Sequence, residues 1–309
     1  MSERSWLVDA IGAPTFQRLA SGLAGSELQS VLLEVMRCRA AARKPKDILA
    51  QYRRDAFCAP ANIDLRTSRF VDSHLLAAAH EFEAVELSPV APLGVCSAVA
   101  VTDQNRVLSA LRMTEVMSDP TNVLALECAS RMRTHPNVQV HLATSQRVVR
   151  AQPVPKLPGY SQHFRIFVLS SGGSESKNHT FTTATLLLHI RTMLSGLERL
   201  ERHGYSFGQP RVKLFATPEK QRLADRIAQR LGEIAEHQLL EHSYYSGGLR
   251  FQIWVSPTEG PAVPLVDGGV FDWLAQIASN RRAVYVASGT GAELIALRFR
   301  KPEAMDTTG

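Results

Sequence analysis

The amino-acid sequence predicts an α+β fold: a mostly antiparallel sheet with flanking helices, preceded by a helical N-terminal extension. Residues 146–152 and 163–169 are two strand-like runs joined by a loop with three prolines, which predicts a hairpin with the prolines outside the sheet. Residues 249–255 alternate apolar and polar side chains, the period of a half-buried strand. Because hairpins outnumber strand-helix-strand crossovers along the chain, we expect antiparallel pairing.

Composition places the chain among globular proteins, with 309 residues of which 45% are apolar and 21% charged. No run of eighteen apolar residues occurs, and residues 1–6 lack a basic-then-apolar leader, so we expect a soluble, cytoplasmic protein with no membrane partner. The four cysteines form no CxxC pair and the ten histidines form no HExxH motif. We therefore expect no structural metal.

We expect three segments: a helical extension over residues 1–60, a core over 61–302, and a disordered polar tail over 303–309. Four apolar side chains of the extension recur at the spacing of a helical stripe, namely Leu28, Val31, Leu32 and Val35. A break at Ala59–Asn62 separates the extension from the core.

The extension also contains a basic stretch from Arg37 to Arg54, with seven basic residues against a single acidic one, Asp47. Such a stretch can neutralise RNA phosphates. A solvated helical face has the same pattern. An RNA-binding module is therefore one function that the sequence leaves open.

The first half of the core predicts a helix, a hairpin with a turn at 103–105, and a short strand, over residues 68–84, 95–110 and 138–143 in that order. A further helix is expected to begin after Asp119, because this residue can cap it and Pro120 suits its first turn.

The second half predicts a long helix over 181–203, with apolar residues along one face and Gly204 at its end. A strand over 212–216 and a helix opened by Thr217 and Pro218 follow. The remaining elements expected are two strands and the turn between them, over 284–287, 294–299 and 289–291.

Three short segments of this region occur in a telling order: Arg147–Gln152 with its hairpin, Tyr244–Gly247, and Gly268–Asp272. A glycine-flanked segment, Ser288–Glu293, lies behind them. Together these segments resemble the catalytic core of the histidyl-tRNA synthetases, which belong to class II of the aminoacyl-tRNA synthetases. The resemblance covers about residues 80–300.

The resemblance implies a nucleotide site for ATP with Mg²⁺. Arg147 matches the arginine that grips the α-phosphate, where a fixed cation stabilises developing charge. Arg150 and Gln152 match the residues that follow it in the histidyl type. Glu293 matches the motif 3 position and completes the expected nucleotide-binding set.

The resemblance also implies an amino-acid site. Asp119 and Thr121 match residues that contact the amino group of the substrate. Tyr244 and Tyr245 match a pair that closes over the histidine side chain. The final segment resembles a glycine turn near the ligand and contributes Gly268, Gly269, Phe271 and Asp272.

Five positions depart from the family pattern where it has charged or polar groups: Val149, Ile166, Ser170, Leu240 and Leu294. A bound phosphate without its arginines lacks charge-assisted hydrogen bonds. We therefore do not expect ordinary histidine activation. The chain also ends soon after Glu293, so the expected organisation lacks the family's anticodon-binding domain.

These observations predict a histidyl-tRNA synthetase-like paralogue that does not charge tRNA and keeps a small-ligand pocket, for an amino acid or nucleotide, in a regulatory or accessory role. The regulatory subunit of the short ATP phosphoribosyltransferase is the nearest precedent, so a protein partner and a homodimer are expected. The alternative is an ATP-dependent adenylate-forming ligase that acts on an amino acid or other small acid, with Arg147 and Arg150 as phosphate grips.

Overall fold

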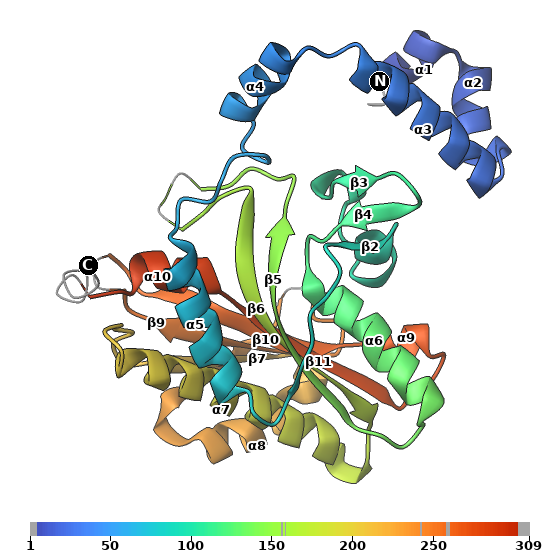
Figure 1. Ribbon diagram of the computed structural model, residues 1–309. Helices are drawn as coiled ribbons and strands as arrows, with labels where there is room; N and C mark the ends of the chain where they lie inside the picture. Colours follow the sequence, from blue (N-terminus) through green and yellow to red (C-terminus); the bar gives the residue numbers. More distant parts are fainter. Residues whose placement is uncertain (1–4, 156, 158, 242, 258–259, 302–309) are drawn as a thin grey trace.

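The computed structural model describes residues 5–155, 157, 159–241, 243–257 and 260–301, and a large twisted sheet lies at its centre (Figure 1). The strands follow one another across the sheet as β1 (Glu83–Ala84), β5 (Val140–Val149), β6 (His163–Ser174), β11 (Ala283–Gly291), β10 (Val263–Phe271), β9 (Leu249–Val255), β7 (Arg211–Ala216) and β8 (Ala235–Leu239). Only the outermost pairs, β1 with β5 and β7 with β8, are parallel. The predicted mostly antiparallel sheet is confirmed.

Helices cover both faces of this sheet. The helices on one face are α5 (Leu65–Ala78), α7 (Thr180–Glu201), α8 (Gln221–Leu231) and α10 (Ala292–Arg298). They enclose the larger core, in which Leu75, Ile190 and Phe251 are at most 1% exposed. The other face carries α6 (Pro120–Thr134) and α9 (Trp273–Ile277), packed over a second core with Leu124 and Tyr285.

A small sheet of β2 (Val90–Pro92), β4 (Thr114–Val116) and β3 (Ser109–Ala110) lies beside the N-terminal end of α6 (Figure 1). Its core joins the main sheet through Val148 of β5, which packs with Val95 and Met117. The small sheet therefore stands at the end of the β5–β6 hairpin, on the same face as α6.

The N-terminal residues are helical, as predicted. They form α1 (Ser5–Ile11), α2 (Ala13–Gln17) and α3 (Gly25–Ala41), with a π-helical turn after α2, and then α4 (Pro45–Arg54). Figure 1 shows α1 to α3 away from the main sheet, with α4 following them along the chain before it reaches the core. No residue with described burial in these helices is buried. The predicted tail, 303–309, lies outside the described residues.

The predicted hairpin over 95–110 is wrong. Residues 95–99 form a π-helical turn and residues 104–106 a 3₁₀ turn, and the short strands come later, as β3 and β4. The reason is a carboxylate from β4. Glu115, 1% exposed, accepts hydrogen bonds from the backbone amides of Gly94 and Cys96 and from the Gln104 side chain. These bonds wrap the segment around one side chain instead of pairing it as strands.

The predicted strand over 294–299 is also wrong, because these residues belong to α10. Short apolar runs fit a strand or a helix equally well in sequence. The segment 289–291 is not a turn, since it lies within β11 and pairs with β6 through Gly291. Likewise, the two predicted strands over 138–143 and 146–152 form one strand, β5, which ends at Val149.

Candidate functional site

A cavity of about 940 Å³ opens on the α6 face of the sheet, between the start of α6, the start of α9 and the loop that precedes β3. We call it the central cavity. Most of the residues predicted for the site line it: Asp119, Thr121, Arg150, Gln152, Tyr244, Tyr245, Gly268, Phe271 and Asp272. The structure therefore brings together side chains that lie up to about 150 positions apart in the chain.

One wall of the central cavity is aromatic. Tyr244 packs edge-on against Tyr245, Phe271 and Trp273, with ring centroids 5.3, 5.4 and 5.9 Å away. Phe271 and Trp273 stack at 4.1 Å. Offset and edge-to-face arrangements of this kind are favourable beyond the area that they bury. Trp273 was missed in the sequence, although it lies directly after the Gly268–Asp272 segment.

A charged pair, Asp267 and Arg250, fixes Tyr245. Its hydroxyl donates to Asp267 at 2.5 Å, and Arg250 donates to the same carboxylate through Nε at 3.0 Å and Nη2 at 2.5 Å. The Arg250 guanidinium also lies over the Tyr245 ring, 5.0 Å from its centroid. Burial and the neighbouring Asp267 raise the pKa of Tyr245, so the phenol remains a donor. Sequence reasoning missed Asp267 and Arg250.

Two glycines allow this packing. A Cβ on Gly269 would lie 2.4 Å from the Leu249 carbonyl oxygen and 2.5 Å from Cδ1 of Tyr245. A Cβ on Gly268 would lie 2.4 Å from Cβ of Ser288 on β11. The predicted glycine turn is therefore wrong. Both glycines lie inside β10, and the atoms close to them belong to the protein itself. Gly268 borders the cavity, whereas Gly269 lies beneath Tyr245.

An aspartate and an arginine, Asp119 and Arg150, face each other at the opposite wall of the central cavity. Asp119 caps α6, accepting from the Thr121 amide at 3.0 Å and the Thr121 hydroxyl at 2.8 Å through Oδ1. Its Oδ2 lies 3.6 Å from Nη2 of Arg150. Arg150 is held by a bond from Nε to the Ser118 carbonyl and by the ring of Phe164 beneath its guanidinium. The cap predicted for Asp119 is confirmed.

Asp272 has a positioning role at the rim. It accepts from the hydroxyl of Ser246 at 2.5 Å and from the side chain of Gln276 at 2.7 Å. The Ser246 hydroxyl oxygen in turn accepts from the Asp272 amide at 3.0 Å. These bonds tie the tyrosine segment to the start of α9, so the aromatic wall is braced from both sides.

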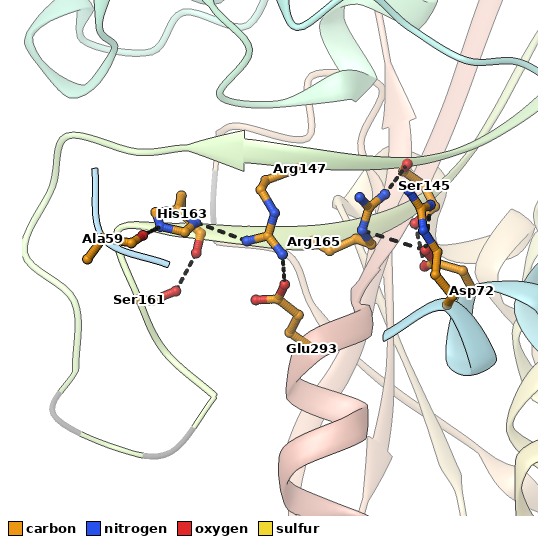
Figure 2. Close-up of polar contacts among 9 residues, drawn as sticks. Ala59, Asp72, Ser145, Arg147, Ser161, His163, Arg165 and Glu293 are labelled. Atoms are coloured by element: carbon orange, nitrogen blue, oxygen red, sulfur yellow. Dashed lines mark hydrogen bonds and ion pairs between the residues drawn. The ribbon is translucent and has the colours of Figure 1, made fainter. Parts of the chain in front are cut away.

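Arg147 and Glu293 do not line the central cavity. Figure 2 shows the Arg147 guanidinium between Glu293 of α10 and His163 of β6. The His163 ring accepts from Arg147 through Nδ1 at 2.9 Å and donates through Nε2 to the Ala59 carbonyl at 2.7 Å. The Glu293 side chain is only 5% exposed. Arg147 and Glu293, both predicted to bind a nucleotide, thus pair with each other.

Strand alternation explains their position. In β5, Arg147 is in register with Arg165 of β6, and Arg165 reaches toward Asp72 of α5, on the face that α5 and α10 cover (Figure 2). Gln146 is in register with Ile166, which lines the central cavity. Successive side chains of a strand point to opposite faces, so a shift of one residue exchanges the two faces.

The structure shows what surrounds three of the positions that depart from the family pattern. Ser170 donates to the hydroxyl of Tyr285, which donates to the Thr121 carbonyl and so holds the start of α6 on the sheet. Leu294 lies beneath Gly291 at the start of α10. Ile166 adds an apolar surface to the central cavity.

No group of three or more His, Cys, Asp or Glu side chains with the placement of metal ligands occurs within the described part of the chain. Cys96 and Cys128 are buried, and burial raises the pKa of the Cys96 thiol to about 11. None of the described helices is both long and apolar enough to cross a lipid bilayer.

No family model and no curated protein matches the sequence. The structure is similar to an ATP phosphoribosyltransferase regulatory subunit/histidyl-tRNA synthetase from Bacillus halodurans C, with a TM-score of 0.61 and 14% identity, over 81% of this chain and 82% of that one.

Two further structures are similar. A histidine–tRNA ligase subunit from Alicyclobacillus acidocaldarius has a TM-score of 0.58 and 11% identity, over 77% of this chain and 94% of that one. Apo histidyl-tRNA synthetase from S. aureus has a TM-score of 0.57 and 10% identity, over 78% of this chain and 68% of that one. At such identities the likeness shows the fold, and this chain has the fold of a class II aminoacyl-tRNA synthetase core like that of the histidyl-tRNA synthetases.

Proposed function

We propose that this protein is a histidyl-tRNA synthetase-like paralogue that does not charge tRNA and binds a small ligand in the central cavity, in a regulatory or accessory role. The observation that carries the proposal is the division of the predicted site between two faces of the sheet. The aromatic wall and the Asp119–Arg150 pair line the cavity, whereas Arg147 and Glu293 pair on the other face. A pocket that lacks the phosphate-gripping arginine favours binding over adenylate formation.

The lining favours an amino acid with an apolar or aromatic side chain. Asp119 can accept from an ammonium group, and Arg150 can donate to a carboxylate, so the pair matches a zwitterion. Tyr244, Phe271 and Ile166 offer apolar contacts where a histidine ring would need polar partners. The ligand then separates Asp119 from Arg150, which lie 3.6 Å apart.

The adenylate-forming ligase remains the alternative proposal. The lining has two arginines, Arg106 and Arg150, against four aspartates: Asp103, Asp119, Asp267 and Asp272. A triphosphate would meet more carboxylates than guanidinium groups, so ATP would need Mg²⁺ to bind here. Arg150, rather than Arg147, would then contact the phosphates.

Calorimetry on the purified chain tests both proposals. We expect saturable binding of an apolar or aromatic amino acid and a loss of affinity of about tenfold or more in Arg150→Gln. Arg147→Gln is the matched control and should bind normally. Saturable binding of ATP with Mg²⁺, lost in Arg150→Gln and followed by pyrophosphate exchange, would move the assignment to the ligase.

A homodimer and a protein partner belong to the same proposal, since a regulatory subunit acts on another chain. Light scattering of the purified protein measures the mass of the assembly. The chain has a mass of 34.0 kDa. A measured mass of twice this value would support the dimer, and a monomer at micromolar concentration would count against it.

RNA binding through the basic stretch is a second candidate. All seven basic side chains between Arg37 and Arg54 are exposed, on α3, α4 and their connection. Tyr52, 44% exposed, offers a ring beside Arg53 for stacking on a base. RNA retention that falls steeply with salt and disappears when the stretch is neutralised would support this function.

A further inference from the structure

A second hollow, which we call the outer groove, lies on the face of the sheet that α5, α7, α8 and α10 cover. It measures about 530 Å³ and lies between α7, the end of α5 and the start of β5, with one residue from α8. This volume is within the range of small-molecule sites. The proposed function uses none of its residues.

Two arginines line the outer groove without an acidic partner among the described residues. Arg191 of α7 and Arg230 of α8 both line it, and both are exposed. Within the described part of the chain, neither guanidinium makes a hydrogen bond or an ion pair. The lining contains one carboxylate, that of Glu81, so guanidinium groups outnumber it. Two cations from different helices favour an anionic ligand.

Two threonines of α7 line the same groove. Thr185 and Thr192 are 2% and 7% exposed, and they lie two turns apart on the lining face of α7. Neither hydroxyl has a hydrogen-bond partner among the described residues, whereas Thr183 of the same helix donates to the His179 carbonyl. Hydroxyl groups that make no hydrogen bond within the protein are available to donate to a ligand oxygen in the groove.

A hydrogen-bonded chain runs from the outer groove along the α7 face of the sheet. His141, which lines the groove, contacts the Ser171 hydroxyl through Nδ1 at 2.7 Å. Ser171 also contacts Nε2 of His189 at 2.9 Å, and Nδ1 of His189 contacts the Ser288 hydroxyl at 2.9 Å. Ser288 borders the central cavity. His189 is completely buried, and burial lowers its pKa to about 3, so its ring is neutral with one donor and one acceptor.

We propose that the outer groove binds a small ligand through a phosphate group, and that the chain of hydrogen bonds from His141 to Ser288 reports its occupancy to the central cavity. Arg191 and Arg230 supply charge, and Thr185 and Thr192 supply neutral donors. These two guanidinium groups and two hydroxyls offer more hydrogen-bond donors than the two oxygens of a carboxylate can accept. A phosphate group has three terminal oxygens to accept them.

The occupied groove selects one arrangement of protons. A phosphate oxygen that accepts from Nε2–H of His141 leaves Nδ1 of that ring as an acceptor. Ser171 must then donate to His141 and accept from Nε2–H of His189. Nδ1 of His189 in turn accepts from the Ser288 hydroxyl. Binding in the outer groove therefore fixes the tautomer of the buried His189 ring.

Calorimetry with inorganic phosphate and with ribose 5-phosphate, on the full chain, tests the site. We expect saturable binding that weakens by about tenfold in Arg191→Gln and in Arg230→Gln. Arg222→Gln is the matched control, because Arg222 is exposed on the same helix as Arg230 and does not line the groove. No binding, equal losses in the control, or equally strong binding of acetate would overturn the proposal.

Thr192→Val and nuclear magnetic resonance provide independent readouts. Valine has nearly the shape of threonine and removes only a hydroxyl that makes no hydrogen bond to the described residues, so it should change the stability of the free chain little while weakening phosphate binding. Phosphate should also shift the His189 ring signals to those of the Nε2–H tautomer. Unchanged phosphate affinity in Thr192→Val would overturn the site, and unchanged His189 signals at saturation would overturn the coupling.

Discussion

At the residue scale, the aromatic wall depends on Gly269, over which the Tyr245 ring lies. The position lies in the middle of a strand, where glycine normally weakens pairing and has no side chain to pack. Here the missing side chain is the useful property, because the space that it would occupy belongs to Tyr245 and the Leu249 carbonyl. The glycine is therefore explained by protein packing, without a ligand.

We expect Gly269→Ala to lower the free energy of unfolding by about 1–3 kcal/mol, because the new methyl group overpacks the site and displaces Tyr245. Urea unfolding measures the change. Gly25→Ala is the control, since a Cβ there meets no atom within 4 Å. Equal stability of the two variants would show that the Tyr245 ring does not occupy this position.

At the element scale, the loop over the central cavity is organised by Glu115 of β4. Burial alone would raise the pKa of this carboxyl group, but the hydrogen bonds from Gln104, Gly94 and Cys96 outweigh it and lower the pKa below its ordinary value. A carboxyl group with a lowered pKa in the folded state stabilises the fold when it is ionised. Its contribution is complete above the unfolded pKa and is lost as the pH falls through the folded one.

We expect Glu115→Gln to lower the stability at pH 7 by about 1–3 kcal/mol, because an amide cannot accept all three bonds. Stability should also fall less between about pH 5 and pH 3 in this variant than in the parent chain. Denaturation at a series of pH values measures both effects. Glu86→Gln, at an exposed position, is the control, and parallel curves for all three proteins would contradict the prediction.

A second prediction at this scale concerns the ion pair between the β5–β6 hairpin and α10. Arg147 and Glu293 connect this hairpin to α10, so we expect a double-mutant cycle of Arg147→Met and Glu293→Gln to give a coupling energy of about 1–3 kcal/mol. The same cycle with Arg150→Met in place of Arg147→Met should give almost none, because Arg150 lies on the other face. Coupling of Glu293 to Arg150 instead would reverse the assignment of faces.

At the scale of the whole molecule, the N-terminal helices and the sheet have separate hydrophobic surfaces. No residue with described burial in α1 to α4 is buried, whereas buried side chains begin at Ser68 in α5. Exposed apolar side chains such as Leu32, Val35 and Leu49 remain on these helices. The stability of the sheet should therefore not depend on them.

Deletion of residues 1–54 should leave the unfolding midpoint of the remaining chain within about 2 °C of the parent, because a change below 0.5 kcal/mol moves a domain of this size by that amount or less. Thermal unfolding followed by circular dichroism measures the midpoint. A large fall would show that the extension packs on the core. Keeping Ala59, whose carbonyl accepts from His163, makes the comparison fair.

Local patterns determined much of this protein from the sequence alone. The antiparallel sheet, the long helix α7 and the Asp119 cap of α6 follow from periodicity and capping chemistry, which act within a few residues. The order of motifs also indicated the class II synthetase core. The tertiary structure alone decided that Arg150 faces the central cavity and Arg147 faces Glu293. That choice depends on strand register, and one residue of shift reverses it. Likewise, Glu115 folds the loop from 94 to 104 because a buried carboxylate needs donors, which it finds in a segment that the sequence assigns to a hairpin.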